Sequence, residues 1–448
     1  MPDVTTFSTA ILTCEKCGQR KLALSLLDEM RSASITPDSV SLTAAISACE
    51  DCGEWEQALS LFDEMRAAGM TLDLILFRMA IAACKNGAQG QRALALLEDM
   101  RVAGIPPDRA TWNEAIFACE KGGQWQRVLW LLDRMRAFRI SPDLSSFNAA
   151  ISACEKRGHS QKALSLLNEM RSEGVAPDAL SLSLTISACE KSGHWEPAVS
   201  LLDDILSLGV APDKKVFNIA ISACDKGGQW QSALSLLDKM HEVGVPRDAM
   251  SFNQAIWACE KGGHWEPAAS LLDEMHRAGI VRDRISFNAV ISACEKAGQW
   301  ERALSLFDQM CMAQVTPNEL SFSVALSACE QGAQCVRALS LLDKMRTLGI
   351  RPGLTSFNAA ISACGRAGHW ERALSLFRDL GSAGVTPDLT SFNAVISACE
   401  RVGQFQQAVS VFEEMLLSCV TPDRFSFNTT LSACEKGGQW EHVLSVLE

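Results

Sequence analysis

The chain contains 448 residues, with a formal net charge of −12, 48% hydrophobic residues, 18 cysteines and no tyrosine. No stretch reaches the apolar length that a membrane-spanning helix requires, so we expect no membrane partner. The acidic balance argues against binding to nucleic acid through bulk charge alone. A chain of this length usually forms several domains, but its strict internal repetition predicts a single elongated array.

One unit recurs from end to end at a spacing of 35 residues, as from Pro107 to Pro142 and on to Pro177. Thirteen units follow one another without an insertion or deletion, and they start near residues 4, 39, 74, 109, 144, 179, 214, 249, 284, 319, 354, 389 and 424. A period of this length is typical of a solenoid, in which each unit buries its apolar face against its neighbours. We therefore expect an all-α protein, an α-solenoid superhelix of about thirteen helix-turn-helix repeats that occupies residues 1–448 as one right-handed array.

The elements of one unit follow in order from Asp143, which comes after a proline and suits a helix N-cap. The spacing i, i+3, i+4, i+7 then predicts an amphipathic helix over residues 144–156, with inward residues Phe147, Ala150, Ile151 and Cys154. Gly158 predicts a turn. A second helix is expected over about residues 160–171, with inward residues Ala163, Leu164, Leu167 and Met170. Each unit is therefore predicted to be a pair of antiparallel helices.

Cysteine and tryptophan also recur at fixed positions. Thirteen cysteines share one position of the first helix, from Cys14 and Cys49 to Cys399 and Cys434. Neighbouring helices pack roughly 9–10 Å apart, too far for a disulfide, so we expect buried thiols in a reducing compartment. The tryptophans begin the second helix and continue an apolar stripe; we interpret them as packing residues, with base stacking as the alternative. They are Trp55, Trp125, Trp195, Trp230, Trp265, Trp300, Trp370 and Trp440.

Asparagine recurs one residue after the aromatic core residue of the first helix. It is a weak helix former, and the sequence offers no structural reason for an amide there. An exposed amide can, however, pair with the edge of a base. The asparagines are Asn113, Asn148, Asn218, Asn253, Asn288, Asn358, Asn393 and Asn428, and Ser8, Thr43, Arg78, Ser183 and Ser323 fill the position in other units.

Two charged rows accompany the asparagines. An aspartate follows the repeated proline, and the row is explained either by helix capping alone or by capping together with base recognition. A basic residue recurs near the end of the first helix, where it can contact a phosphate backbone, complement the helix dipole, or do both. This basic row consists of Lys16, Lys121, Lys156, Lys191, Lys226, Lys261, Lys296, Arg366, Arg401 and Lys436.

With Phe-Asn, a glycine turn, Ala-Leu…Met and Gly-x-x-Pro-Asp in a helix pair of 35 residues, the chain resembles the pentatricopeptide repeat family over essentially its whole length. The related tetratricopeptide unit has 34 residues and a tyrosine position, whereas tyrosine is absent here. The resemblance implies sequence-specific binding of single-stranded RNA, with one unit per base and the N-terminal units towards the 5′ end.

In that family, bases are read by the Asn, Ser or Thr of one unit together with the Asp or Asn after the next proline. The corresponding pairs are Ser8/Asp38, Thr43/Asp73, Asn113/Asp143, Asn148/Asp178, Ser183/Asp213, Asn218/Asp248, Asn253/Asp283, Asn288/Asn318, Asn358/Asp388 and Asn393/Asp423. By the family's code they predict the RNA 5′-G-G-?-U-U-G-U-U-Y-?-U-U-3′. Arg78/Asp108 and Ser323/Gly353 leave the two blanks.

The resemblance also identifies a row of side chains that sandwich the bases. It consists of Thr5, Val40, Ile75, Ala110, Ser145, Leu180, Lys215, Met250, Ile285, Leu320, Thr355, Thr390 and Phe425. Lys215, Ala110 and Ser145 are poor sandwiching groups. For contacts with phosphate we select Lys121, Lys156, Lys191, Lys226, Lys261 and Lys296.

Patterns typical of enzymes are incomplete. His194-Trp195-Glu196 matches half of a zinc deaminase motif, but the Pro-Cys-x-x-Cys half is absent. The pairs Cys14/Cys17 and Cys49/Cys52 have zinc-like spacing, yet one cysteine of each belongs to the core row. We expect no enzyme activity, metal or cofactor. The alternative to RNA binding is a peptide-binding or protein-binding α-solenoid scaffold, which provides no reason to repeat Asn with Asp.

The resemblance favours a mitochondrion or chloroplast, with the cytoplasm as the alternative. It implies a role in RNA processing, transcript stabilisation or editing-site selection, in some cases beside a separate RNA-processing enzyme. The last unit stops within its second helix, over about residues 440–448. We therefore expect an incomplete array whose uncapped end frays and self-associates.

Overall fold

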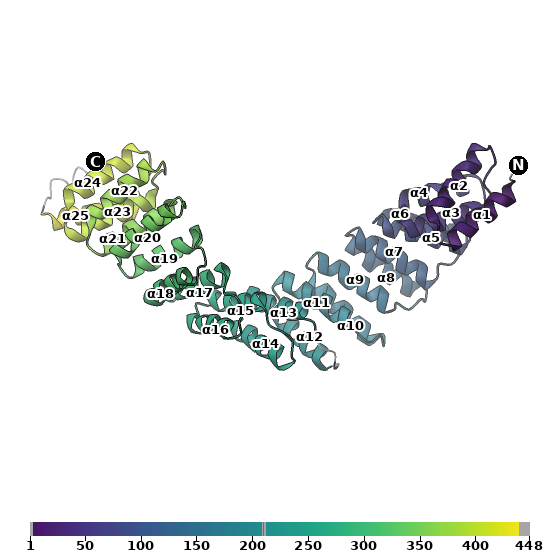
Figure 1. Ribbon diagram of the computed structural model, residues 1–448, viewed down its shortest axis with the longest axis horizontal. Helices are drawn as coiled ribbons and strands as arrows, with labels where there is room; N and C mark the ends of the chain where they lie inside the picture. The colour runs from purple at the N-terminus through teal and green to yellow at the C-terminus, as the bar shows by residue number, and fades with distance from the viewer. Residues whose placement is uncertain (1–2, 208, 210–211, 439–448) are drawn as a thin grey trace. The chain divides into compact units, whose positions relative to one another are not determined.

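The computed structural model describes residues 3–207, 209 and 212–438, and the secondary structure in these ranges is all-α. Figure 1 shows the helices as successive pairs, which confirms the predicted solenoid of helix-turn-helix repeats. The chain divides into two compact units, residues 1–223 and 224–448. The expected last helix, over about residues 440–448, and Trp440 lie outside the described residues.

The first helices of the repeats are α1 (Val4–Lys16), α3 (Ser39–Cys52), α5 (Leu74–Asn86), α7 (Arg109–Lys121), α9 (Leu144–Lys156), α11 (Ala179–Ser192), α13 (Lys214–Lys226), α15 (Ala249–Lys261), α17 (Arg284–Lys296), α19 (Glu319–Gln331), α21 (Leu354–Arg366), α23 (Leu389–Val402) and α25 (Arg424–Lys436). The second helices are α2 (Arg20–Ser32), α4 (Trp55–Ala67), α6 (Gly90–Val102), α8 (Trp125–Ala137), α10 (Ser160–Ser172), α12 (Trp195–Ser207), α14 (Trp230–Glu242), α16 (Trp265–Arg277), α18 (Trp300–Met312), α20 (Cys335–Thr347), α22 (Trp370–Ser382) and α24 (Phe405–Leu417).

The predicted aspartate caps are confirmed. Asp143 has an extended backbone, and its carboxylate accepts a hydrogen bond from the Ser146 backbone N–H at 2.9 Å. The Ser146 hydroxyl in turn contacts the Asp143 N–H, which completes a capping box. Gly353 occupies the same position before α21 and provides no side-chain bond. Local capping chemistry therefore starts most first helices at the residue after the aspartate.

The core lies between helices of the same and neighbouring repeats. In α9 the four predicted inward residues are all buried, and α9 packs against α10 and α11. One detail of the second helix was wrong, since Leu164 is only half-buried whereas Leu166 is buried. The buried stripe of α10 runs through Ala163, Leu166, Leu167 and Met170, which is the i, i+3, i+4, i+7 spacing and leaves Leu164 at its edge.

The tryptophan row packs against the turn of the following repeat. A Cβ atom at Gly87 would collide with the Trp55 ring, so only glycine permits this close approach. Trp125 and His159 lie with their ring centroids 4.4 Å apart. These contacts support the packing interpretation for Trp55 and Trp125. Among the described residues, no helix combines the length and hydropathy needed to span a membrane.

Candidate functional site

The two rows predicted to read bases meet at the junctions between repeats. The Nδ2 atom of Asn113 donates to both carboxylate oxygens of Asp143 at 3.2 Å. The same bond, thirty residues apart in the chain, links Asn148 to Asp178 at 3.3 Å, Asn288 to Asn318 at 3.3 Å, Asn358 to Asp388 at 3.2 Å and Asn393 to Asp423 at 3.4 Å. Each pair therefore combines an amide from one repeat with the helix cap of the next.

A serine completes several of these junctions. The Ser146 hydroxyl donates to the Oδ1 atom of Asn113 at 2.6 Å, so the amide of Asn113 bridges two groups of the next repeat. Equivalent bonds run from Ser181 to Asn148, Ser391 to Asn358 and Ser426 to Asn393. The inference that structure provides no reason for an amide at this position was wrong, because the reason lies in the neighbouring repeat and not within the helix.

The asparagines of the central repeats differ from the others. Asn218 and Asn253 are only 7% and 6% exposed, whereas Asn113 and Asn148 are half-buried. The Oδ1 atoms of Asn218, Asn253 and Asn288 have no hydrogen-bond partner among the described residues. In the repeat after Asn253, the Ser286 hydroxyl donates instead to the backbone carbonyl of Asp283. These amide oxygens are therefore acceptors whose bonding capacity the described chain leaves unused.

Asp248, predicted to read a base together with Asn218, departs from the arrangement at Asp143. Its carboxylate accepts a hydrogen bond from the Ser251 backbone N–H at 3.0 Å and so caps α15. The Ser251 hydroxyl donates at 2.8 Å to the backbone carbonyl of Asp248. Asn218 belongs to the compact unit of residues 1–223, whereas Asp248 belongs to that of residues 224–448. The capping explanation is therefore confirmed for Asp248, and its pairing with Asn218 in base recognition stays a prediction.

Hydroxyl residues replace asparagine at three of the predicted positions. Ser8 donates to Asp38 at 2.8 Å and so keeps the contact between repeats. Thr43 and Ser183 donate to carbonyls one turn earlier in their own helices, those of Ser39 and Ala179. Their predicted partners, Asp73 and Asp213, are exposed.

Three of the capping carboxylates, those of Asp143, Asp178 and Asp388, have a pKa below the ordinary value. Burial by itself would raise the pKa of Asp143, but hydrogen bonds from Ser146 and Asn113 favour the charged form and lower the pKa below its ordinary value. The pKa values of Asp178 and Asp388 are lowered in the same way, with burial again opposed by hydrogen bonds from the next serine and the preceding asparagine. Each of these junctions thus presents a fixed negative charge and an amide.

Exposed apolar side chains lie in the row that the family resemblance identifies as the base sandwich. Val40, Ile75, Leu180, Met250, Ile285, Leu320 and Phe425 are each between 47% and 59% exposed. A solvated helix surface does not require such a regular row of large apolar side chains. Residues of α19, α21, α23 and α25 line one hollow of about 610 Å³, which includes Asn358, Thr390, Asn393 and Phe425.

The basic row is engaged in ion pairs across repeats. The Nζ atom of Lys156 lies 2.6 Å from Oε1 of Glu120, which also accepts a hydrogen bond from Ser152 at 2.8 Å. Lys191, Lys261, Lys296 and Lys436 pair in the same way with Glu155, Asp225, Glu260 and Glu400. Among the described residues Lys121 forms no such pair, because Lys85 stands where the acidic residue occurs in other repeats. The sequence analysis did not predict the acidic partners of these lysines. The signal was present, because a glutamate often precedes the basic residue in the recurring Glu-Lys dipeptide.

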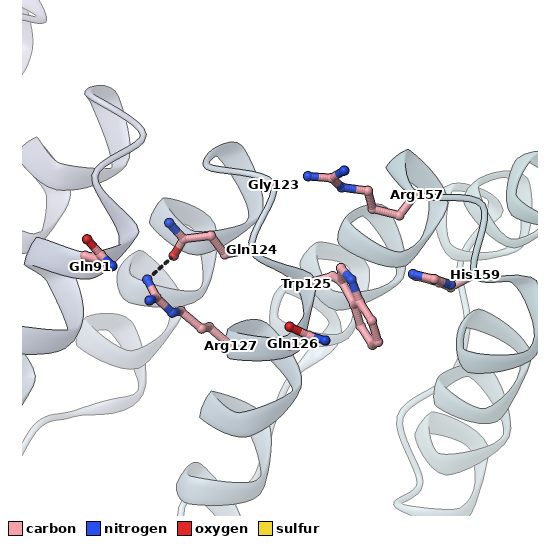
Figure 2. Close-up of a pocket in the computed structure, with 8 residues that line it drawn as sticks. All are labelled: Gln91, Gly123, Gln124, Trp125, Gln126, Arg127, Arg157 and His159. Carbon is pink, nitrogen blue, oxygen red and sulfur yellow. Dashed lines mark hydrogen bonds between the residues drawn. The ribbon is translucent and has the colours of Figure 1, made fainter.

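A second hollow, of about 600 Å³, lies at the turns between the helices of successive repeats. Figure 2 shows Trp125 beside His159, with Arg157 above them and Arg127 turned towards Gln124. Arg127 donates to the Oε1 atom of Gln124 at 2.8 Å. The lining residues come from the turns and the starts of second helices and include none of the predicted base-reading residues.

The cysteine row is buried, as expected, apart from the half-buried Cys14. Burial raises the pKa of Cys154 to about 11, so this thiol stays protonated near neutral pH. We expected the thiols to be too far apart to pair, and one pair differs from this. Cys335 occupies the position that is tryptophan in other repeats, and its Sγ atom lies 2.6 Å from the Sγ atom of Cys364. The described residues contain no group of three or more side chains placed to hold a metal ion.

Comparison with known proteins identifies related repeats. A family model described as the pentacotripeptide-repeat region of PRORP matches residues 28–208 and 274–448, and a model described as a pentatricopeptide repeat-containing protein matches residues 198–310. None of the curated proteins matches the chain significantly.

Three solved structures illustrate the structural similarity. The pentatricopeptide repeat protein PPR10 in complex with an 18-nt psaJ RNA element is 22% identical, with 100% of this chain and 69% of that chain covered and a TM-score of 0.48. The pentatricopeptide repeat protein PPR10 from maize is 18% identical, with 100% of this chain and 73% of that chain covered and a TM-score of 0.42. The PPR domain of Arabidopsis thaliana protein-only RNase P 1 in complex with tRNA is 19% identical, with 42% of this chain and 96% of that chain covered and a TM-score of 0.36.

Proposed function

This chain belongs to the pentatricopeptide repeat family, and from that premise we propose that it binds single-stranded RNA with one repeat per base. The observation that carries the proposal is the junction between repeats, where an amide and an ionised cap are hydrogen-bonded beside an exposed apolar side chain. The amide and carboxylate can pair with the edge of a base, and the apolar side chain can cover its face. Repetition of the junction then fixes one base per repeat.

The code of the pentatricopeptide repeat family assigns a base to most of these junctions. Asn with Asp favours uracil, Ser or Thr with Asp favours guanine, and Asn with Asn accepts either pyrimidine. In chain order this leads to 5′-G-G-?-U-U-G-U-U-Y-?-U-U-3′.

The basic row supports a secondary role in binding the backbone. The Nζ groups of Lys121, Lys156, Lys191, Lys226, Lys261 and Lys296 lie near the ends of first helices, and a phosphate can be bound there without displacing the acidic partner. Since most of these lysines are paired, the net attraction per repeat is smaller than that of a free ammonium group. We therefore assign specificity to the junctions and only part of the affinity to the lysines.

Binding of this kind acts by occupancy. A bound array can protect a transcript, keep it unstructured, or position a separate RNA-processing enzyme, and we propose a mitochondrion or chloroplast as the site of action. The competing proposal is a peptide-binding scaffold. Bonds between repeats explain the amide row under either proposal, so the two are distinguished by the ligand that binds.

Selection of bound RNA from a random single-stranded pool tests the function. We expect enrichment of a U-U-G-U-U core, followed by loss of preference at one position when a single junction is changed. A matched pool of random peptides, immobilised in the same way, serves as the comparison. Enrichment of peptides without enrichment of RNA overturns the proposal, and RNAs that lack the core overturn the assignment of bases.

A further inference from the structure

In the fourth repeat, four departures from the repeated sequence line one cavity. Trp112 replaces the usual phenylalanine or leucine, Trp130 a serine or alanine, Arg134 in most repeats an acidic residue, and Phe138 in most repeats a small residue. These positions are separated in the sequence but converge on a cavity of about 410 Å³ between α6 and α8. This volume lies in the range of ligand-binding pockets. The convergence of independent departures indicates a built site and not random drift.

The walls of the cavity are aromatic and apolar. Trp112 and Phe138 lie with ring centroids 5.7 Å apart, and Leu94 and Leu97 of α6 form the opposite side. Trp130 and Phe138 are 48% and 46% exposed, which is unusual for side chains of this size in the second helices and the segments after them. Such walls can enclose one aromatic or aliphatic side chain of a partner.

A buried hydrogen-bond donor of one lining residue has no acceptor. Trp112 is only 4% exposed, and its indole Nε1 has no partner among the described residues. A buried indole N–H group usually has an acceptor, because leaving it unpaired is costly. The phenylalanine of other repeats fills the core without this polar atom. A ligand that brings an acceptor to the indole would satisfy this group.

The rim carries a cation where other repeats carry an acidic residue. Along the second helices, an arginine of one repeat pairs with an acid of the next, as in Arg66 with Asp99 and Arg171 with Asp204. The residue in the corresponding position opposite Arg101 is Arg134, so two positive charges face each other where other repeats form an ion pair. Arg101 pairs instead with Glu98 of its own helix. The guanidinium of Arg134 lies over the Trp130 ring, 4.9 Å from its centroid, and forms no ion pair among the described residues.

We propose that this cavity binds a peptide segment of a partner protein, with one aromatic side chain as the anchor and one carboxylate beside it. The ring enters between Trp112, Trp130 and Phe138, a carbonyl or carboxylate oxygen accepts from the Trp112 indole, and the carboxylate pairs with Arg134. Arg101 and Glu98 neutralise each other, so the rim carries one net positive charge and matches one carboxylate. A single net positive charge suits one carboxylate better than the many phosphates of a polyanion such as RNA.

The probe is the labelled peptide Ac-Ser-Gly-Asp-Phe-Gly-Ser-NH2, compared with versions that carry Asn-Phe or Asp-Ala. We expect the full chain to bind the Asp-Phe peptide in fluorescence anisotropy and the other two at least tenfold more weakly. The indole ¹⁵N–¹H signal of Trp112, assigned with Trp112→Phe, should shift on titration with the Asp-Phe peptide. An unmoved Trp112 signal overturns the proposal, and so does equal binding of the Asn-Phe peptide.

Variants that restore the residues of sibling repeats keep the fold and remove the cavity chemistry. Trp130→Ser, Phe138→Ala and Arg134→Glu should each weaken Asp-Phe binding at least tenfold, while Leu348→Ala, at the position equivalent to Phe138, should not. Thermal unfolding of each variant verifies folding. RNA binding should remain unchanged in Trp130→Ser. A twelve-residue oligouridine that displaces the peptide or shifts the Trp112 signal overturns the proposal in favour of RNA.

Discussion

The Nδ2 atom of Asn113 lies 3.2 Å from both carboxylate oxygens of Asp143, the cap of the next repeat's first helix. The contact joins the residue proposed to face a base to the residue that starts a helix. A change in either residue therefore acts on recognition and on the junction between repeats. Variants at positions that serve only one of these roles separate the two effects.

Thr43→Asn should change the base preferred by the second repeat from guanine towards uracil. Thr43 is half-buried on α3, and among the described residues its hydroxyl bonds only to the Ser39 carbonyl. We therefore expect the free energy of unfolding to change by no more than about 0.5 kcal/mol. Binding of two RNAs that differ only at that base measures the change. An unaltered preference with intact affinity would show that the position does not read bases.

Lys121→Ala and Lys156→Ala should differ in their effect on salt dependence. Lys121 has no acidic partner among the described residues, so its loss should flatten the slope of log K against log salt by about 0.7. Lys156 shares its charge with Glu120, so we expect a smaller change in slope together with lower stability. Binding titrations at several salt concentrations, with urea unfolding, measure both. Equal flattening would mean that RNA opens the Lys156–Glu120 pair.

Acid should destabilise the array through the capping carboxylates. Hydrogen bonds, opposed by burial, lower the folded-state pKa of Asp143 and Asp178 below the ordinary value of 3.8. Their stabilisation is therefore complete above the unfolded pKa and is lost as the pH falls through the lower folded pKa. Urea midpoints at pH 6, 4 and 3 should fall in that order. Asp143→Asn, which copies the natural cap Asn318, should reduce this dependence, and an unchanged dependence would exclude Asp143 as a source.

Cys335 and Cys364 should be the cysteines that cross-link under mild oxidation with diamide. Their sulfur atoms are 2.6 Å apart, so the two thiols are in direct contact. Formation of the bond transfers two electrons and two protons from the thiols to diamide. We expect the reaction to be slow, because burial raises the pKa of Cys364. Peptide mapping measures the product, with Cys335→Ser as the control; a cross-link that persists in this variant contradicts the assignment.

The repeat unit was predictable because its signals are local. The period of 35 residues, the limits of α9 at Leu144 and Lys156, and the cap at Asp143 depend on chemistry within a few residues of each helix end. The same holds for the buried row of the first helix, since apolar spacing alone determines which face is inward. Leu164 was assigned wrongly because Leu164 and Leu166, which are separated only by Ser165, lie at the two edges of one apolar stripe and only Leu166 is buried.

The sequence by itself determined the helices, their caps and the rows of residues that each repeat presents. Only the tertiary structure decided which rows meet. The bond from Asn113 to Asp143, the pairing of Lys156 with Glu120 and the cavity around Trp112 all depend on the distance and angle between neighbouring repeats. Helix periodicity defines directions around one axis but not the side chains across the junction. The physical reason is that these contacts form between helices, where packing sets the geometry.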